Sequence, residues 1–336
     1  MGRLVRWGYG LVGAGLLTLA AAAASSAGRL DGFNVNAPPD HPFGSASAGT
    51  ALAQARELGA NAVAIIPFLW QASPASPNIV RGSDMPDELL RAAIRQARGA
   101  GLAVIVKPHV WVPQSWAGAV APMSETDWQI WFAGYRDAIA RIARIAAEEQ
   151  ADAFAIGTEL EKTTHRPEWQ GIVTAVRTAF SGTLTYFAHN TEEAERIPFW
   201  KQLDAVGVTL YPALGADGDR AGRLTKMRLV ADAIDALAIS TGKPALVGEI
   251  GLRSALGAAA KPWESPEERD SAPDPSLQAD VLRDWITVLD RPTINGVLIW
   301  RWFTDPKAGG LTDTDFTVQN KPAEDVLRCA WRKQCR

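Results

Sequence analysis

The segment DAFAIGTELEK, at residues 152–162, shows the sequence pattern that recurs along the chain and predicts its fold. Its first half is a short, uninterrupted apolar run, which is typical of a parallel strand buried on both faces. After a glycine, Glu159 and Glu161 stand at the end of that run. Removing a carboxylate from water is costly, so one placed at the end of a buried strand indicates a functional group.

The same pattern, a short apolar run followed by polar residues, recurs along the chain. The predicted strands are residues 32–37, 61–68, 101–108, 152–159, 183–189, 204–211, 244–250 and 294–300. The predicted helices are residues 45–58, 86–98, 127–147, 167–180, 192–202, 222–240, 276–289 and 322–333. Eight alternating strand and helix units predict an α/β fold with a single closed (β/α)8 TIM barrel.

The lengths of the connections support the barrel more strongly than the count of units does. Segments that enter strands are short, such as ELGA, RGAG and STGK, whereas those that leave strands are long and rich in Trp, Pro, Asn, Asp and His. Long loops at the carboxyl ends of strands carry the active sites of such barrels. A doubly wound open sheet is the alternative, but no GxGxxG follows the first predicted strand.

The N-terminus predicts a targeting segment. Arg3 and Arg6 precede an apolar stretch, and small residues follow up to Ala27. Residues 1–27 are therefore predicted to be a signal peptide, with an uncleaved anchor as the alternative, and residues 28–336 the barrel domain. We expect a chain exported to the periplasm or secreted, with no other contact with a membrane.

Other features of the composition exclude several classes of function. The 336 residues carry a net charge of −3 with no long run of one sign, so nucleic acid is not an expected partner. The four histidines form no HExxH pair, and no metal or organic cofactor is expected. A redox enzyme is excluded because the sequence has no glycine-rich loop for binding a dinucleotide.

Cys329 and Cys335 form a possible disulfide, two free thiols being the alternative. We expect a monomer.

Two glutamates carry the predicted chemistry. Glu159 ends the fourth predicted strand, and Glu249, in LVGEIG, ends the seventh. Strands four and seven of an eight-stranded barrel face each other across its mouth. Glycoside hydrolysis uses such a pair, because one carboxyl protonates the departing oxygen while the other attacks the anomeric carbon or activates water. Glu161, two residues beyond Glu159, is the rival for the role on strand four.

Aromatic and polar residues near the same strand ends predict a sugar-binding cleft. Flat aromatic rings pack on the C–H faces of sugars. Trp300 ends the eighth strand, and Tyr211, after the sixth, could donate a hydrogen bond to Glu249. Sugar contacts are also predicted for His109, Asn190, Trp70, Trp111 and Trp116.

Several segments together resemble a known family. They are KPHVWV, GTELE, LTYFAHN, FWKQLDAVGVTLYP, VGEIGLRS, IWRW and DFTVQNKPAEDVL. In this order they are similar to family 113 of the glycoside hydrolases, a member of clan A, and to the barrel domain of gene-transfer-agent proteins. The resemblance covers residues 32–328 and implies a retaining mechanism with Glu159 as acid/base and Glu249 as nucleophile. It also implies activity of the β-1,4-mannanase type.

We therefore interpret the sequence as a retaining glycoside hydrolase that cleaves a β-linked hexose polysaccharide or oligosaccharide, with β-1,4-mannan as the first expectation. The alternative is a non-catalytic, carbohydrate-binding barrel that acts in exopolysaccharide or cell-envelope export. Such a protein would keep the tryptophans but would not require two opposed glutamates.

Overall fold

The computed structural model describes residue 2 and residues 28–333. Eight parallel strands close into a barrel in the order β1-β11-β10-β9-β8-β7-β5-β2. The barrel strands are β1 (Leu30–Asn36), β2 (Ala62–Ile65), β5 (Ala103–Val106), β7 (Ala153–Thr158), β8 (Thr183–His189), β9 (Val206–Leu210), β10 (Ala245–Ile250) and β11 (Ile294–Phe303). The predicted (β/α)8 barrel is confirmed. The predicted signal peptide at 1–27 and Cys335, half of the possible disulfide, lie outside the described residues.

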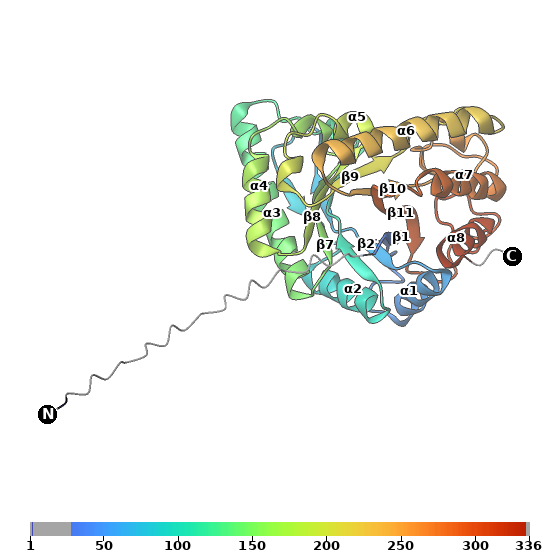
Figure 1. Ribbon diagram of the computed structural model, residues 1–336, viewed down its shortest axis with the longest axis horizontal. Helices are drawn as coiled ribbons and strands as arrows, with labels where there is room; N and C mark the ends of the chain where they lie inside the picture. The colour runs from blue at the N-terminus through green and yellow to red at the C-terminus, as the bar shows by residue number, and fades with distance from the viewer. Residues whose placement is uncertain (1, 3–27, 334–336) are drawn as a thin grey trace.

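Helices surround the strands in the order of the chain (Figure 1). They are α1 (Ala46–Leu58), α2 (Asp87–Gly99), α3 (Glu125–Glu148), α4 (Trp169–Ala179), α5 (Asn190–Ala194), α6 (Arg220–Thr241), α7 (Pro275–Val288) and α8 (Pro322–Arg332). Short 3-10 turns occur at Ala117–Ala119, Glu161–Thr163, Trp200–Gln202 and Ala258–Ala260. In the part of the chain that is described, no helix combines the length and the apolar character that crossing a membrane requires.

The interior of the barrel is filled mainly by small side chains around one ring. Ala62, Ala64 and Ala155 are fully buried there beside Phe187. Gly248 on β10 makes room for this ring, because a Cβ at that position would lie 2.3 Å from Cδ1 of Phe187. The barrel is thus a packed core, and the space for a ligand lies at its mouth.

A small second sheet, absent from the sequence-based prediction, extends one side of the mouth. It consists of β3 (Phe68–Gln71), β4 (Ile79–Arg81) and β6 (His109–Trp111) in the order β4-β3-β6. The predicted strand at 61–68 therefore ends early at Ile65, and Phe68 begins a different sheet. The predicted helix at 192–202 is also wrong: α5 ends at Ala194, and only a 3-10 turn follows.

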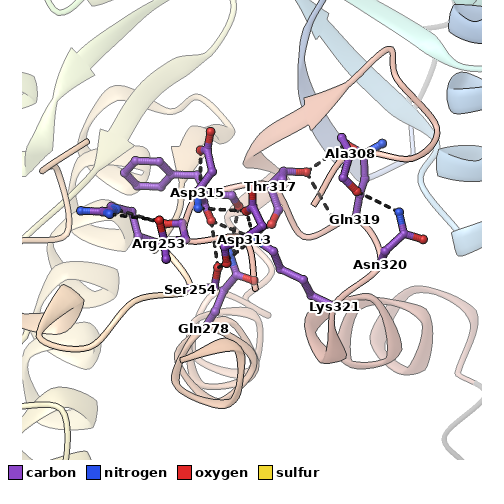
Figure 2. A network of polar contacts seen from close by, with 12 residues as sticks. Arg253, Ser254, Gln278, Ala308, Asp313, Asp315, Thr317, Gln319, Asn320 and Lys321 are labelled. Atoms are coloured by element: carbon purple, nitrogen blue, oxygen red, sulfur yellow. Dashed lines mark hydrogen bonds and ion pairs between the residues drawn. The ribbon is translucent and has the colours of Figure 1, made fainter. Parts of the chain in front are cut away.

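A buried lysine fastens together the loops that follow β10 and β11 (Figure 2). The Lys321 ammonium donates to Ser254 Oγ at 2.8 Å, to Asp313 Oδ1 at 2.5 Å and to the Asp315 carbonyl at 2.9 Å. Burial lowers the pKa of Lys321, while Asp313 opposes this effect. We call Ser254, Asp313, Asp315 and Lys321 the Lys321 clamp, and it fixes one wall of the mouth.

Candidate active site

Glu159 lies directly after β7 with a left-handed backbone, at a φ of 55°. This conformation turns the chain sharply at the strand end, where few residues other than glycine adopt it readily. Two donors reach the same carboxylate oxygen, Oε1: the hydroxyl of Thr209 at 2.5 Å and Nδ1 of His189 at 3.3 Å. The carboxyl group is thereby held over the barrel mouth by residues of β8 and β9.

Glu249 lies within β10 and is almost fully buried, with 7% of its surface exposed. Its Oε1 forms an ion pair with the ammonium of Lys107, a residue that is completely buried just after β5. Its Oε2 accepts a hydrogen bond from the hydroxyl of Tyr211 at 2.9 Å. A buried carboxylate is tolerated only with such partners, which compensate the cost of its burial and fix its orientation.

The register of the barrel brings the two glutamates together. Thr209 is the β9 partner of Glu249 in the parallel ladder, and its hydroxyl is the group that donates to Glu159. The charges of both glutamates act on His109 and on Tyr211. Both carboxyl groups therefore lie at the same end of the barrel, on either side of β9.

Glu159 and His189 each shift the pKa of the other. Burial raises the pKa of Glu159, but the hydrogen bond and charge of His189 outweigh burial, and the pKa falls to about 2. Burial lowers the pKa of His189, but Glu159 outweighs it and raises that pKa. Carboxyl and imidazole thus hold one exchangeable proton between them.

Asn190 fixes which nitrogen of His189 faces Glu159. The backbone N–H of Tyr211 donates to Asn190 Oδ1 at 3.1 Å, so the amide nitrogen of Asn190 must be the atom that lies 3.1 Å from His189 Nε2. Since that nitrogen is a donor, Nε2 accepts, and the proton of the neutral ring sits on Nδ1, which donates to Glu159. Asn190 therefore favours the neutral form of His189, whereas Glu159 raises the pKa of the ring and favours the protonated form.

Aromatic rings line the mouth beside the glutamates. Trp116 packs against His189 with ring centroids 4.8 Å apart, and it is 40% exposed. Trp300, partly exposed at the end region of β11, lies 5.6 Å from the ammonium of Lys107. Burial lowers the pKa of His109, which keeps its ring neutral and able to act as one donor and one acceptor.

The wall behind Trp300 and Tyr211 depends on the Lys321 clamp. Asp315 forms an ion pair with Arg301 at 2.5 Å, and the guanidinium of Arg301 lies 5.8 Å from the Trp300 ring. The next residue, Phe316, meets the Tyr211 ring edge-on at 6.4 Å. The loop after β11 thus supports both residues from outside the barrel.

Other predicted residues lie further from the glutamates. Glu161, the rival of Glu159, forms an ion pair with Arg196 at 2.6 Å. Trp70 and Trp111 face each other on the second sheet. Among residues 28–333, no group of three or more His, Cys, Asp or Glu side chains is arranged to hold a metal ion.

Sequence reasoning missed four polar residues of the site: Lys107, Thr209, His189 and Glu193. Only Lys107 carried a usable signal, since a lysine that directly follows the apolar run AVIV stands where a buried strand ends. Thr209 and His189 become visible only through their contacts with Glu159 from other strands, and Glu193 only through the hydrogen bonds that it accepts from Tyr186 and His189 in the folded chain.

A closed barrel has two glutamates at its mouth, one paired with a lysine and a tyrosine and the other with a histidine and a threonine. This is the kind of carboxyl pair that glycosidases use. The model of Glycoside Hydrolase Family 113 matches residues 34–321, and the chain belongs to this family. It is a hydrolase that acts on carbohydrate.

Solved structures show the same fold. The β-mannanase AaManA of this family from Alicyclobacillus acidocaldarius superposes with a TM-score of 0.79 at 23% identity, covering 92% of this chain and 98% of that one. A β-1,4-mannanase of the family gives 0.80 and 23%, covering 91% and 100%. A β-glucuronidase from Ruminococcus gnavus gives 0.60 at 14%, covering 90% of this chain and half of that one. No curated protein matches the chain.

Proposed function

We propose that this chain is a retaining β-glycosidase of the β-1,4-mannanase type, with Glu249 as nucleophile and Glu159 as acid/base. One observation carries the assignment of roles: the two carboxyls have opposite surroundings. Glu249 is paired with the ammonium of Lys107 and accepts a hydrogen bond from Tyr211, partners that suit a nucleophilic carboxylate. Glu159 shares a proton with His189, as a residue that gives and takes protons must.

In the first step, a carboxylate oxygen of Glu249 attacks the anomeric carbon, and the bond from that carbon to the glycosidic oxygen breaks. Glu159 takes up the proton that it shares with His189 and passes it to the departing oxygen. Because Thr209 and His189 both donate to Oε1, we assign this proton to Oε2. The product of this step is a glycosyl ester on Glu249 and a shortened chain.

In the second step, ionised Glu159 removes a proton from a water molecule. The oxygen of that water attacks the anomeric carbon, and the ester bond to Glu249 breaks. The enzyme returns to its starting state, and the sugar keeps the configuration that it had in the substrate. The hydrogen bond from Tyr211 and the ion pair with Lys107 stabilise the departing carboxylate.

The similarity to the two β-mannanases supports the proposed specificity for mannan, and a panel of polysaccharides tests it. We expect reducing ends to be released from β-1,4-mannan or glucomannan and not from chitosan or β-glucan. Release from another member of the panel would change the assigned sugar and leave the mechanism intact. No release from any member would favour a barrel that only binds carbohydrate.

Two variants test the roles. Glu249→Ala should abolish turnover. Azide should restore part of it by attacking the anomeric carbon from the α face in place of the carboxylate, which gives an α-glycosyl azide of inverted configuration. Glu159→Gln should lose roughly 10²–10⁴-fold on glycosides with poor leaving groups and much less on activated aryl glycosides. Equal loss on both kinds of substrate would transfer the acid role to another residue.

We also propose that the chain is exported after cleavage near Ala27 and acts as a monomer. The positive and apolar pattern of residues 1–27 supports export. N-terminal sequencing of the protein recovered from the periplasm or the medium tests the cleavage, and an intact Met1 on that protein would contradict it. Light scattering tests the monomer.

A further inference from the structure

Four aromatic rings lie on one face of the second sheet. β3 and β6 run parallel with Phe68 opposite His109 and Trp70 opposite Trp111. Residues two apart on a strand point to the same face, so all four rings share it. Ring centroids lie 5.9 Å apart for Phe68 and His109 and 6.0 Å apart for the two tryptophans.

This row begins at the catalytic mouth. His109 is close enough to both glutamates for their charges to act on its ring. Two residues further along the strands, a distance of roughly 6–7 Å, come Trp70 and Trp111. These two are 37% and 49% exposed, which is unusual for side chains of their size. The row therefore leads outward from the cleavage point to an open aromatic surface.

The ring of Trp70 is held in one orientation even though its face is open. Its Nε1 donates to Asp84 Oδ1 at 3.2 Å. Gly82 lies beneath it, and a Cβ there would come within 2.3 Å of Nε1. Backbone and Asp84 thus fix the edge of the indole and leave its face free. A merely misplaced apolar side chain would need neither of these supports.

We propose that Trp70 and Trp111 form an accessory platform that binds sugar units of the same glycan chain beyond those at the cleaved bond. The inference rests on the proposed function and adds a position to it. The ligand is the pyranose ring of a β-linked hexose polymer, whose C–H faces pack on indole rings. A platform outside the mouth makes the enzyme prefer long chains to short ones.

The test compares manno-oligosaccharides of two and six units as substrates of the wild type, Trp70→Ala, Trp111→Ala and Gly82→Ala. The last variant keeps both indoles and displaces one. We expect kcat/KM for the long substrate, divided by that for the short one, to fall roughly tenfold or more in each variant, mainly through KM. Ile239→Ala is the control, because Ile239 is 73% exposed near the end of α6, at the opposite end of the barrel. Its ratio should match that of the wild type.

A ratio that stays at the wild-type value in all three variants would overturn the platform, as would an equal loss on both lengths. If the wild type hydrolyses neither oligosaccharide, the proposed function fails separately. The platform is then tested by calorimetric binding of the six-unit oligosaccharide. Weaker binding by Trp70→Ala and Trp111→Ala than by the wild type and Ile239→Ala supports it, and equal or absent binding overturns it.

Discussion

Glu193 in α5 is a buried carboxyl group that takes no part in the chemistry but connects the two strand ends that carry Glu159 and His189. Its Oε1 accepts from the Tyr186 hydroxyl at 2.7 Å, and its Oε2 accepts from the His189 N–H at 2.5 Å. The Tyr186 oxygen accepts in turn from the N–H of Leu160, the residue after Glu159. We predict that Glu193→Gln changes how stability depends on pH.

The magnitude follows from the surroundings of the carboxyl. Burial raises the pKa of Glu193 from 4.5 to about 7, although the hydrogen bonds from Tyr186 and His189 oppose it. As pH rises from 4.5 to 7, the unfolded chain releases this proton while the folded chain keeps it. Folded protein is therefore stabilised below pH 4.5 and loses that contribution as pH rises through 7. The loss amounts to about 3 kcal/mol.

Urea unfolding at pH 4.5, 6 and 8 measures the effect. A glutamine can accept from the His189 N–H and donate to the Tyr186 oxygen, and it does not titrate. The free energy of unfolding of the wild type, relative to Glu193→Gln, should fall by about 3 kcal/mol across this range. Glu192→Gln, an exposed neighbour on the same helix, serves as control. Parallel curves for wild type and Glu193→Gln would refute the reasoning.

Three further changes test other contacts. Asn190→Asp replaces the donor to His189 Nε2 with a negatively charged acceptor, so the imidazole holds the shared proton more firmly. Turnover should fall and the alkaline limb of kcat/KM should move to higher pH; an unmoved limb would contradict the tautomer. Lys107→Met leaves Glu249 buried without its cation, and kcat/KM on an aryl glycoside should fall roughly 10²–10³-fold; near-normal turnover would show that the ion pair is dispensable. Asp284→Asn leaves the buried Arg223 without its carboxylate, and the free energy of unfolding in urea should fall by about 3–5 kcal/mol, whereas the exposed Asp280→Asn should change little.

Most of the barrel could be predicted because its strands are buried on both faces and read as apolar runs. The second sheet was missed where a proline interrupts such a run. Pro67 separates β2 from β3, and Pro108 separates β5 from β6. Proline has no N–H for the ladder, so the barrel strand must end there, and the chain leaves to pair elsewhere. The prolines in IIPF (residues 65–68) and VKPH (residues 106–109) therefore marked in the sequence where each barrel strand ends.

The error at 192–202 has a similar cause. Pro198 lies inside the apolar spacing of that segment, and a proline in a helix interior removes a hydrogen bond and clashes with the preceding turn. The chain instead forms α5 and a separate turn at Trp200.

The two glutamates could be found from sequence because each ends an apolar strand. Their partners could not be found in this way. Thr209 and His189 contact Glu159 from two other strands, and a single sequence contains no sign of that proximity. The side chains that tune a carboxyl are therefore harder to predict than the carboxyl itself.

The Lys321 clamp has a consequence for the conditions under which the mouth keeps its shape. Oxygen atoms of a side-chain carboxylate, a hydroxyl and a carbonyl surround its ammonium, which is the kind of shell that a dissolved inorganic cation occupies in many extracellular enzymes. Here the positive charge is tethered to the polypeptide and cannot diffuse away. We therefore expect a chelator, or a change in the concentration of divalent cations, to leave this loop junction intact.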